Sequence, residues 1–117
     1  MNDISIYFSP VENYCKEIKK GFLGHNMHVH TKNYFPDINP NDIVLFSVPE
    51  FRNSNTSFQE SLDYINFRRS LARLSDNDLK SEILDIGVLS PGETLEDTYY
   101  ALSSAVAEIL KQQALPI

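Results

Sequence analysis

Two apolar runs separated by a stretch of helical periodicity constrain the fold of this chain more than any other feature. The runs, DIVLFSV at Asp42–Val48 and ILDIGVL at Ile83–Leu89, are apolar at successive positions instead of alternate ones. A strand of that kind buries both of its faces, as in a parallel sheet covered by helices. The stretch between them, Ser57–Leu74, has apolar residues at helical spacing: Phe58, Leu62, Ile65, Phe67 and Leu71. Strand, helix and strand in this order predict an α/β fold with a mainly parallel sheet.

A second helix follows, and its start is well marked. Thr94 has the side chain of an N-cap, and Asp97 lies three residues later, near the position of a capping box. The apolar residues that follow are expected to face the core: Leu95, Tyr99, Leu102, Val106, Ile109 and Leu110. Leu115–Ile117 has the composition of the first residues of another buried strand, so we expect the domain to continue beyond it.

The N-terminal part is less regular. Asp3–Phe8 alternates, which predicts a half-buried strand with Ile4, Ile6 and Phe8 on one face. Pro10–Lys20 predicts a short helix that ends at the following glycines. A second strand is possible at Met27–Thr31, and the prolines in residues 33–42 indicate a loop.

Composition narrows the class of protein. A chain of 117 residues is long enough for one domain. The net charge of −6 disfavours binding to nucleic acid or to an anionic membrane surface, and no run approaches the ~20 apolar residues of a membrane span. The single cysteine, Cys15, cannot form an internal disulfide, so a reducing cytoplasm is the simplest compartment.

The histidines form the pattern H-x-x-H-x-H at His25, His28 and His30. Two imidazoles two residues apart on a strand can share a zinc or nickel ion, but no acid or cysteine lies at a tight spacing to complete the shell. We therefore favour a solvent-facing side of an edge strand and predict no metal site. Cys15 is interpreted as a free, partly buried thiol and not as a nucleophile.

Several charged residues are candidates for the carboxyl-terminal edge of the sheet, where open α/β folds bind ligands. Glu50, Arg52 and Asn53 follow the first core strand and are our first choices for substrate contact, with a solvated loop as the alternative. Asp85 could serve near such a site, but the Asp-x-Gly pattern favours a cap on a backbone turn. Arg68 and its neighbour Arg69 either pair with acids or face solvent.

Three segments resemble the ureohydrolase family of arginase, agmatinase and formimidoylglutamase. DIVLFSVPEFRNSN at Asp42–Asn55 resembles its first core strand and polar active-site loop, and FRRSLARL at Phe67–Leu74 resembles the helix segment behind that loop. Ile83–Ile117 resembles the family's Asp-x-Gly strand, its turn, and the long helix that leads into an Ile-Pro strand. The run PGETLEDTYYAL is most similar to a subgroup of formimidoylglutamase-like and arginase-like proteins.

The resemblance implies part of a three-layer α/β/α sandwich, with residues 42–117 in the core and residues 1–41 as a variable segment. It implies hydrolysis of a guanidino or formimino C–N bond by the intact protein. The family's two manganese ions are held by Gly-Gly-x-His and Asp-x-His-x-Asp motifs that would follow Ile117. This chain therefore offers no metal ligand, cofactor site or catalytic residue, and we do not expect activity from it alone.

Two departures from the family leave an alternative open. Ser47 stands where the family commonly has glycine, and Val88 where it often has aspartate. The alternative is a non-catalytic α/β domain for interaction or binding. In the family interpretation the partner is the remainder of the ureohydrolase chain. An uncovered sheet edge and helix face would also promote a homo-oligomer.

Overall fold

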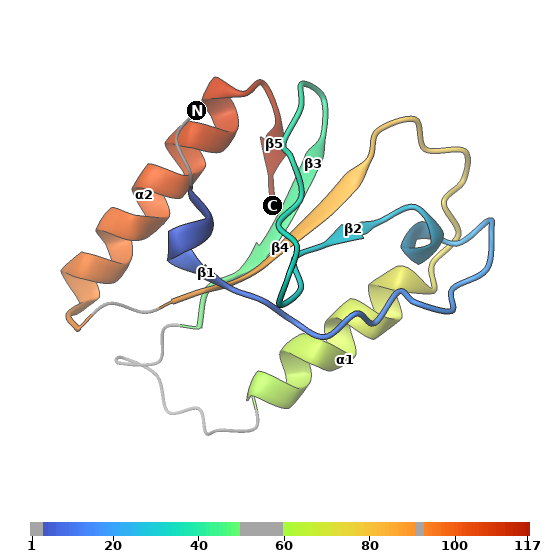
Figure 1. Cartoon of the computed structure of the whole chain (residues 1–117), viewed down its shortest axis with the longest axis horizontal. Helices are drawn as coiled ribbons and strands as arrows, with labels where there is room; N and C mark the ends of the chain where they lie inside the picture. The colour runs from blue at the N-terminus through green and yellow to red at the C-terminus, as the bar shows by residue number, and fades with distance from the viewer. Residues whose placement is uncertain (1–3, 50–59, 91–92) are drawn as a thin grey trace.

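The computed structural model describes residues 4–49, 60–90 and 93–117, and in this part of the chain it shows an α/β fold with a mixed sheet (Figure 1). The elements are η1 (Ile4–Tyr7), β1 (Phe8–Ser9), η2 (Leu23–His25), β2 (His28–Val29), β3 (Ile43–Ser47), α1 (Glu60–Ala72), β4 (Ile83–Leu89), α2 (Leu95–Lys111) and β5 (Leu115–Pro116). None of the helices in these ranges combines the length and apolar character that crossing a membrane requires.

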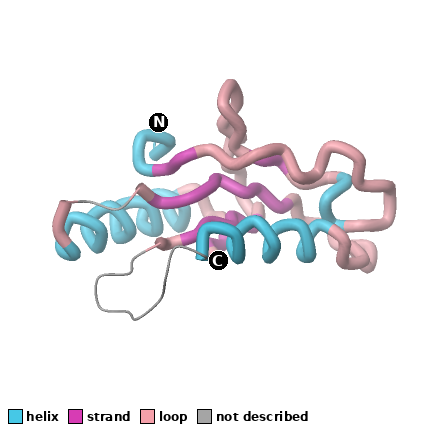
Figure 2. Tube along the Cα trace, turned by 90° about the horizontal axis from the view of Figure 1, so that it is seen from below, coloured by secondary structure: helices cyan, strands magenta, loops and turns pink. Residues whose placement is uncertain are grey.

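The strands predicted to be parallel are parallel, and β4 lies at the centre. It pairs with β3 on one side, while β2 (parallel) and β1 (antiparallel) share its other edge. The N-terminal segment that carries β1 and β2 runs along this edge of the sheet (Figure 2). β5 pairs with β3 and bonds to it through Leu115 and Ile117, so the nitrogen of Pro116 faces the outer edge.

The two helices cover opposite faces of the sheet, and Figure 1 shows the strands passing between them. Ile86 and Val44 pack with three α2 residues, Ala101, Ala105 and Ile109, in the main core cluster. The neighbouring Asp85 contacts Arg68 of α1. Because successive residues of a strand point to opposite faces, α1 and α2 lie on different sides. The chain crosses the sheet in one direction from β3 to β4 and in the other direction from β4 to β5. Two right-handed crossovers in opposite directions place their connecting helices on opposite faces of the sheet.

Both predictions for the start of the chain were wrong. The described part of Asp3–Phe8 is a 3₁₀ turn followed by β1, with Ile6 75% exposed and Ile4 and Phe8 buried. The two buried residues lie in different elements, Ile4 in the 3₁₀ turn and Phe8 in β1, and both belong to the main core cluster. Pro10–Lys20 forms turns and irregular backbone instead of a helix. The strand predicted at Met27–Thr31 is confirmed by β2, and the region predicted as a loop contains no helix.

Both long helices are confirmed, but each exposes residues that were predicted to face the core. In α1, Phe67 is 58% exposed and Arg68 takes the inward position at 1%. In α2, Tyr99 and Leu110 are more than half exposed, which corrects their assignment to the core. The residues that α2 buries are Thr98, Ala101, Ala105, Glu108 and Ile109. Small side chains let this helix lie close to the sheet. The predicted cap is present: the Asp97 amide donates to Oγ1 of Thr94 at 3.1 Å.

A bulge in β4 brings the N-terminal segment close to the sheet. Leu45 pairs with Asp85 but Phe46 pairs with Gly87, so β4 has one extra residue there. Gly87 has φ +99°, and a Cβ at this position would lie 2.1 Å from the carbonyl oxygen of Ser9. Only glycine fits both the backbone angle and the approach of β1.

We expect Gly87→Ala to lower the free energy of unfolding by about 3 kcal/mol or more, because it adds a backbone clash to a strained φ. Gly21→Ala is the matched control, since Gly21 has φ +98° and no atom near the added Cβ. It should cost only about 1–2 kcal/mol. Urea denaturation followed by circular dichroism measures both, and equal losses would contradict a close β1 contact.

Candidate functional site

The carboxyl-terminal ends of β3 and β4 lie side by side. Ser47 pairs with Val88 in parallel register, so the chain leaves both strands at the same edge of the sheet. Ligands of α/β proteins bind at such an edge. The predicted contact residues Glu50, Arg52 and Asn53 follow β3 but lie outside the described residues. The structure therefore locates the edge without placing these side chains.

Within the sheet, on the face that α1 covers, a buried ion pair joins Asp85 to Arg68. Nε of Arg68 donates to Oδ2 of Asp85 at 2.6 Å, and Nη2 donates to Oδ1 at 3.1 Å. Both side chains are almost completely buried. The arginine also donates to the carbonyl of Gly87 at 2.9 Å, and the Gly87 amide donates to Oδ1 of Asp85 at 3.0 Å. The pair thus holds α1 against the β4 bulge.

The N-terminal segment completes this cluster. The hydroxyl of Tyr14 donates to Oδ2 of Asp85 at 2.5 Å. Burial, together with the negative charge of Asp85, raises the pKa of Tyr14 far above its ordinary value, so it remains a phenol. The His30 amide donates to the carbonyl of Asp85 at 2.7 Å, and Nδ1 of its ring lies 2.9 Å from the carbonyl of Ile86. Each residue of the bulge is therefore held by hydrogen bonds from another segment.

The hydrogen bonds of Asp85 decide what it can do chemically. A carboxylate has about four acceptor positions, and four donors from Arg68, Tyr14 and Gly87 occupy the oxygens of this one. It has no free lone pair for a metal ion or for accepting a proton from substrate, so its role is structural. The predicted backbone cap is present as the hydrogen bond from the Gly87 amide. For Arg68 the sequence left two alternatives, pairing with an acid or facing solvent, and the structure shows pairing with Asp85.

The neighbouring polar residues also lack catalytic features. Arg69 forms an exposed ion pair with Glu12. Cys15 is free and partly buried, as predicted. Burial, and secondarily the charge of Asp85, raises the pKa of this thiol to about 11. At neutral pH the group is a protonated thiol, which is a poor nucleophile.

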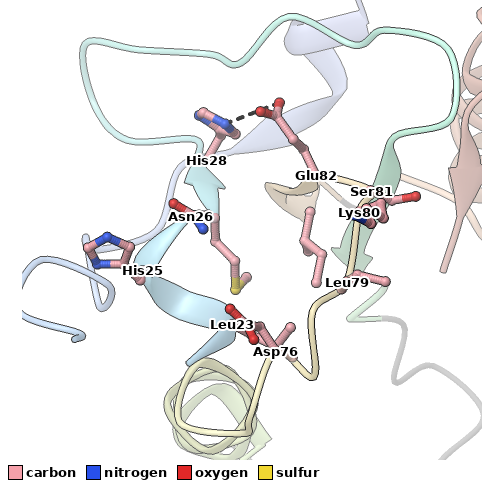
Figure 3. A pocket seen from close by; sticks show the side chains of 11 residues that line it. Leu23, His25, Asn26, His28, Asp76, Leu79, Lys80, Ser81 and Glu82 are labelled. Atoms are coloured by element: carbon pink, nitrogen blue, oxygen red, sulfur yellow. Dashed lines mark ion pairs between the residues drawn. The ribbon is translucent and has the colours of Figure 1, made fainter. Parts of the chain in front are cut away.

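The three histidines do not converge on one point. His28 lies at a pocket of about 360 Å³ beside the amino-terminal ends of β2 and β4, where its Nε2 is 3.3 Å from Oε2 of Glu82 (Figure 3). Figure 3 places Asp76 at the far end of that pocket. Nδ1 of His25 bonds instead to the backbone of Ile18. Within the described ranges, no group of three or more His, Cys, Asp or Glu side chains could hold a metal ion.

His30 corrects the solvent-facing interpretation of this strand. It is only 8% exposed and packs edge-on against Phe35, with ring centroids 4.8 Å apart. Its burial follows from a contact with a residue in the next loop and from the hydrogen bond to Ile86, neither of which has a signal in the alternation pattern. Only His25 and His28 remain accessible to solvent.

We expect Arg68→Ala to lower the free energy of unfolding by about 3–5 kcal/mol, because it leaves the charge of Asp85 buried and unpaired. Arg69→Ala, one residue away in an exposed ion pair, should cost less than about 1 kcal/mol. Tyr14→Phe should be intermediate, at about 1–3 kcal/mol, through loss of a hydrogen bond to a charged group. Chemical denaturation measures all three, and similar values for the two arginine variants would argue against the buried pair.

Comparison with known proteins does not add a family. No family model matches the chain, and no curated protein or solved structure is significantly similar to it.

Proposed function

We propose that this chain is the N-terminal region of a ureohydrolase-family hydrolase. In this proposal it supplies strands, helices and one active-site loop to a cytoplasmic enzyme that hydrolyses a guanidino or formimino C–N bond. The chain alone has no activity, and its first partner is the remainder of the same fold.

One observation carries the proposal. The resemblance rests partly on FRRSLARL and partly on the Asp-x-Gly strand, which are well separated in sequence. Arg68 from the first motif and Asp85 from the second meet in a bidentate ion pair at the centre of the structure. Two motifs recognised separately are thus parts of one arrangement, which supports their origin in a common fold.

The strand arrangement adds support. The three strands that the resemblance assigns to the core, β3, β4 and β5, are parallel neighbours, and helices cover both faces. This is the arrangement from which a three-layer α/β/α sandwich is built. The loops that leave β3 and β4 begin at one edge, where Glu50, Arg52 and Asn53 are proposed to contact substrate.

Manganese does not fit the residues described here. Asp85 is saturated by donors, and the described side chains form no group suited to a metal ion. In the proposal the metal ligands belong to later strands of the intact protein. The contribution of this chain is to bind and orient the substrate and to support the strands that hold those ligands.

The alternative, a non-catalytic interaction domain, is favoured by one surface, the outer face of α2. Tyr99, Tyr100 and Leu110 are 55%, 70% and 56% exposed, and the small residues Ser103 and Ala107 lie between them at helical spacing. Large apolar side chains gathered on one helix face are typical of an interface. Small residues in the centre would allow close approach of another helix.

Charge favours a second copy of this chain as the occupant of that face. Glu96 and Asp97 are exposed at the start of α2, and Lys111 is exposed at its end. If two α2 helices pack antiparallel about a two-fold axis, the acids of each copy lie beside the lysine of the other. One helix face buries less than the ~800 Å² per partner of a standard interface, so this dimer is expected to be weak.

The enzymatic proposal is tested by reading the gene beyond Ile117 and assaying its full product. We expect Gly-Gly-x-His and Asp-x-His-x-Asp to follow, and hydrolysis of arginine, agmatine or formimidoylglutamate in the presence of manganese. Arg52→Ala should raise KM about tenfold through loss of a charged contact, while Arg69→Ala leaves it unchanged. Absence of the motifs and of hydrolysis would refute the proposal.

The dimer is tested by analytical ultracentrifugation over a wide concentration series. Leu110→Glu should abolish association. Glu96→Lys and Lys111→Glu should each weaken it about tenfold, and the double variant should restore it, because the charges then pair in reverse. A monomer at every concentration, or a dimer whose Kd is unchanged by the charge reversals, would exclude antiparallel α2 packing.

A further inference from the structure

A second pocket, of about 570 Å³, lies between the N-terminal segment at residues 13–22 and the last turn of α1. Its volume is in the range of small-molecule sites, about 300–1,000 Å³. It is separate from the proposed catalytic edge. α1 is the next described element after β3, and its 13 residues extend about 20 Å before Arg73 reaches the pocket.

The charge of this pocket is opposite to that of the whole protein. Lys16, Lys19 and Arg73 line it together with a single acid, Glu17, although the chain has a net charge of −6. All three basic side chains belong to exposed residues. Among the described residues, none of the three forms a side-chain hydrogen bond or ion pair. Unpaired cations around a concave surface concentrate anions there.

Two aromatic residues also line the pocket, together with Asn13 and Ile18. Phe22 is 41% exposed. Tyr14 also lines the pocket, but its hydroxyl is held by Asp85 and is not available to a ligand. The apolar part of the pocket therefore consists of two aromatic rings and the aliphatic side chain of Ile18, and it suits a planar group that can stack on a ring.

We infer that this pocket binds a small organic anion that carries a phosphate or carboxylate on an aromatic body. Lys16, Lys19 and Arg73 bind the anionic group, and Phe22 packs against the ring. Arginine and lysine are the side chains that recognise these anions in proteins. Nucleic acid is a poorer match, because three cations on an acidic protein cannot neutralise an extended phosphate backbone. This inference does not depend on the proposed function.

The test is a titration of the ¹⁵N-labelled chain with phenyl phosphate, benzoate, inorganic phosphate and phenol, followed by NMR. We expect saturable shifts confined to residues 13–22 and 73, with Kd of about 1 mM or lower for phenyl phosphate or benzoate. The tighter of these two ligands identifies the anionic group. Inorganic phosphate and phenol, which each lack one half of the ligand, should bind at least about tenfold more weakly.

Matched charge variants make the test specific. Lys19→Gln and Arg73→Gln should each weaken binding about fivefold or more, as expected for a charged contact. Lys80→Gln removes an exposed charge from the other pocket and should have no effect. All three residues are exposed, so the variants should fold normally. Shifts that do not saturate, or an equal loss of binding in Lys80→Gln, would overturn the inference.

Discussion

The rest of the structure depends on the buried ion pair between Arg68 and Asp85. Removing two charges from water is expensive, and their attraction offsets that cost only when the remaining polar atoms are also satisfied. Here the completing partners are the hydroxyl of Tyr14, from the N-terminal segment, and the amide of Gly87, two residues further along β4. The cluster is therefore stable only when α1, the β4 bulge and the N-terminal segment are all in place. It makes folding of the described regions cooperative.

The sequence predicted the elements whose signals are local. β3, β4, both helices, the cap at Thr94 and the strand at Leu115 follow from apolar runs, helical spacing or a capping side chain within a few residues. Apart from β2, the N-terminal segment could not be predicted in this way, because distant contacts determine its structure. The Val11 amide donates to the carbonyl of His30, and Gly24 lies against Ala72 of α1. A period of two or of 3.6 residues carries no information about such contacts.

The hydrogen-bonded cluster around Asp85 was also predictable only where its contacts are local in sequence. The bond from the Gly87 amide to Asp85 spans two residues and was foreseen from the Asp-x-Gly pattern. The ion pair with Arg68 joins different elements, and it also explains why Arg68 and not Phe67 faces the sheet. A hydrophobicity argument places Phe67 inside and arginine outside, yet a buried carboxylate on the sheet requires the reverse. Periodicity gives the presence of a helix more securely than the face it buries.

Pro116 gives the sheet a selective outer edge. Because its ring nitrogen faces away from β3, β5 presents a carbonyl there but no amide hydrogen. A strand added at this side would leave one of its own carbonyl groups without a donor, so indiscriminate pairing with extended peptides is penalised. A strand that belongs beside β5 must supply a compensating donor, such as a side chain or an ordered water, at that position. One imino acid thus sets a recognition requirement for any extension of the sheet.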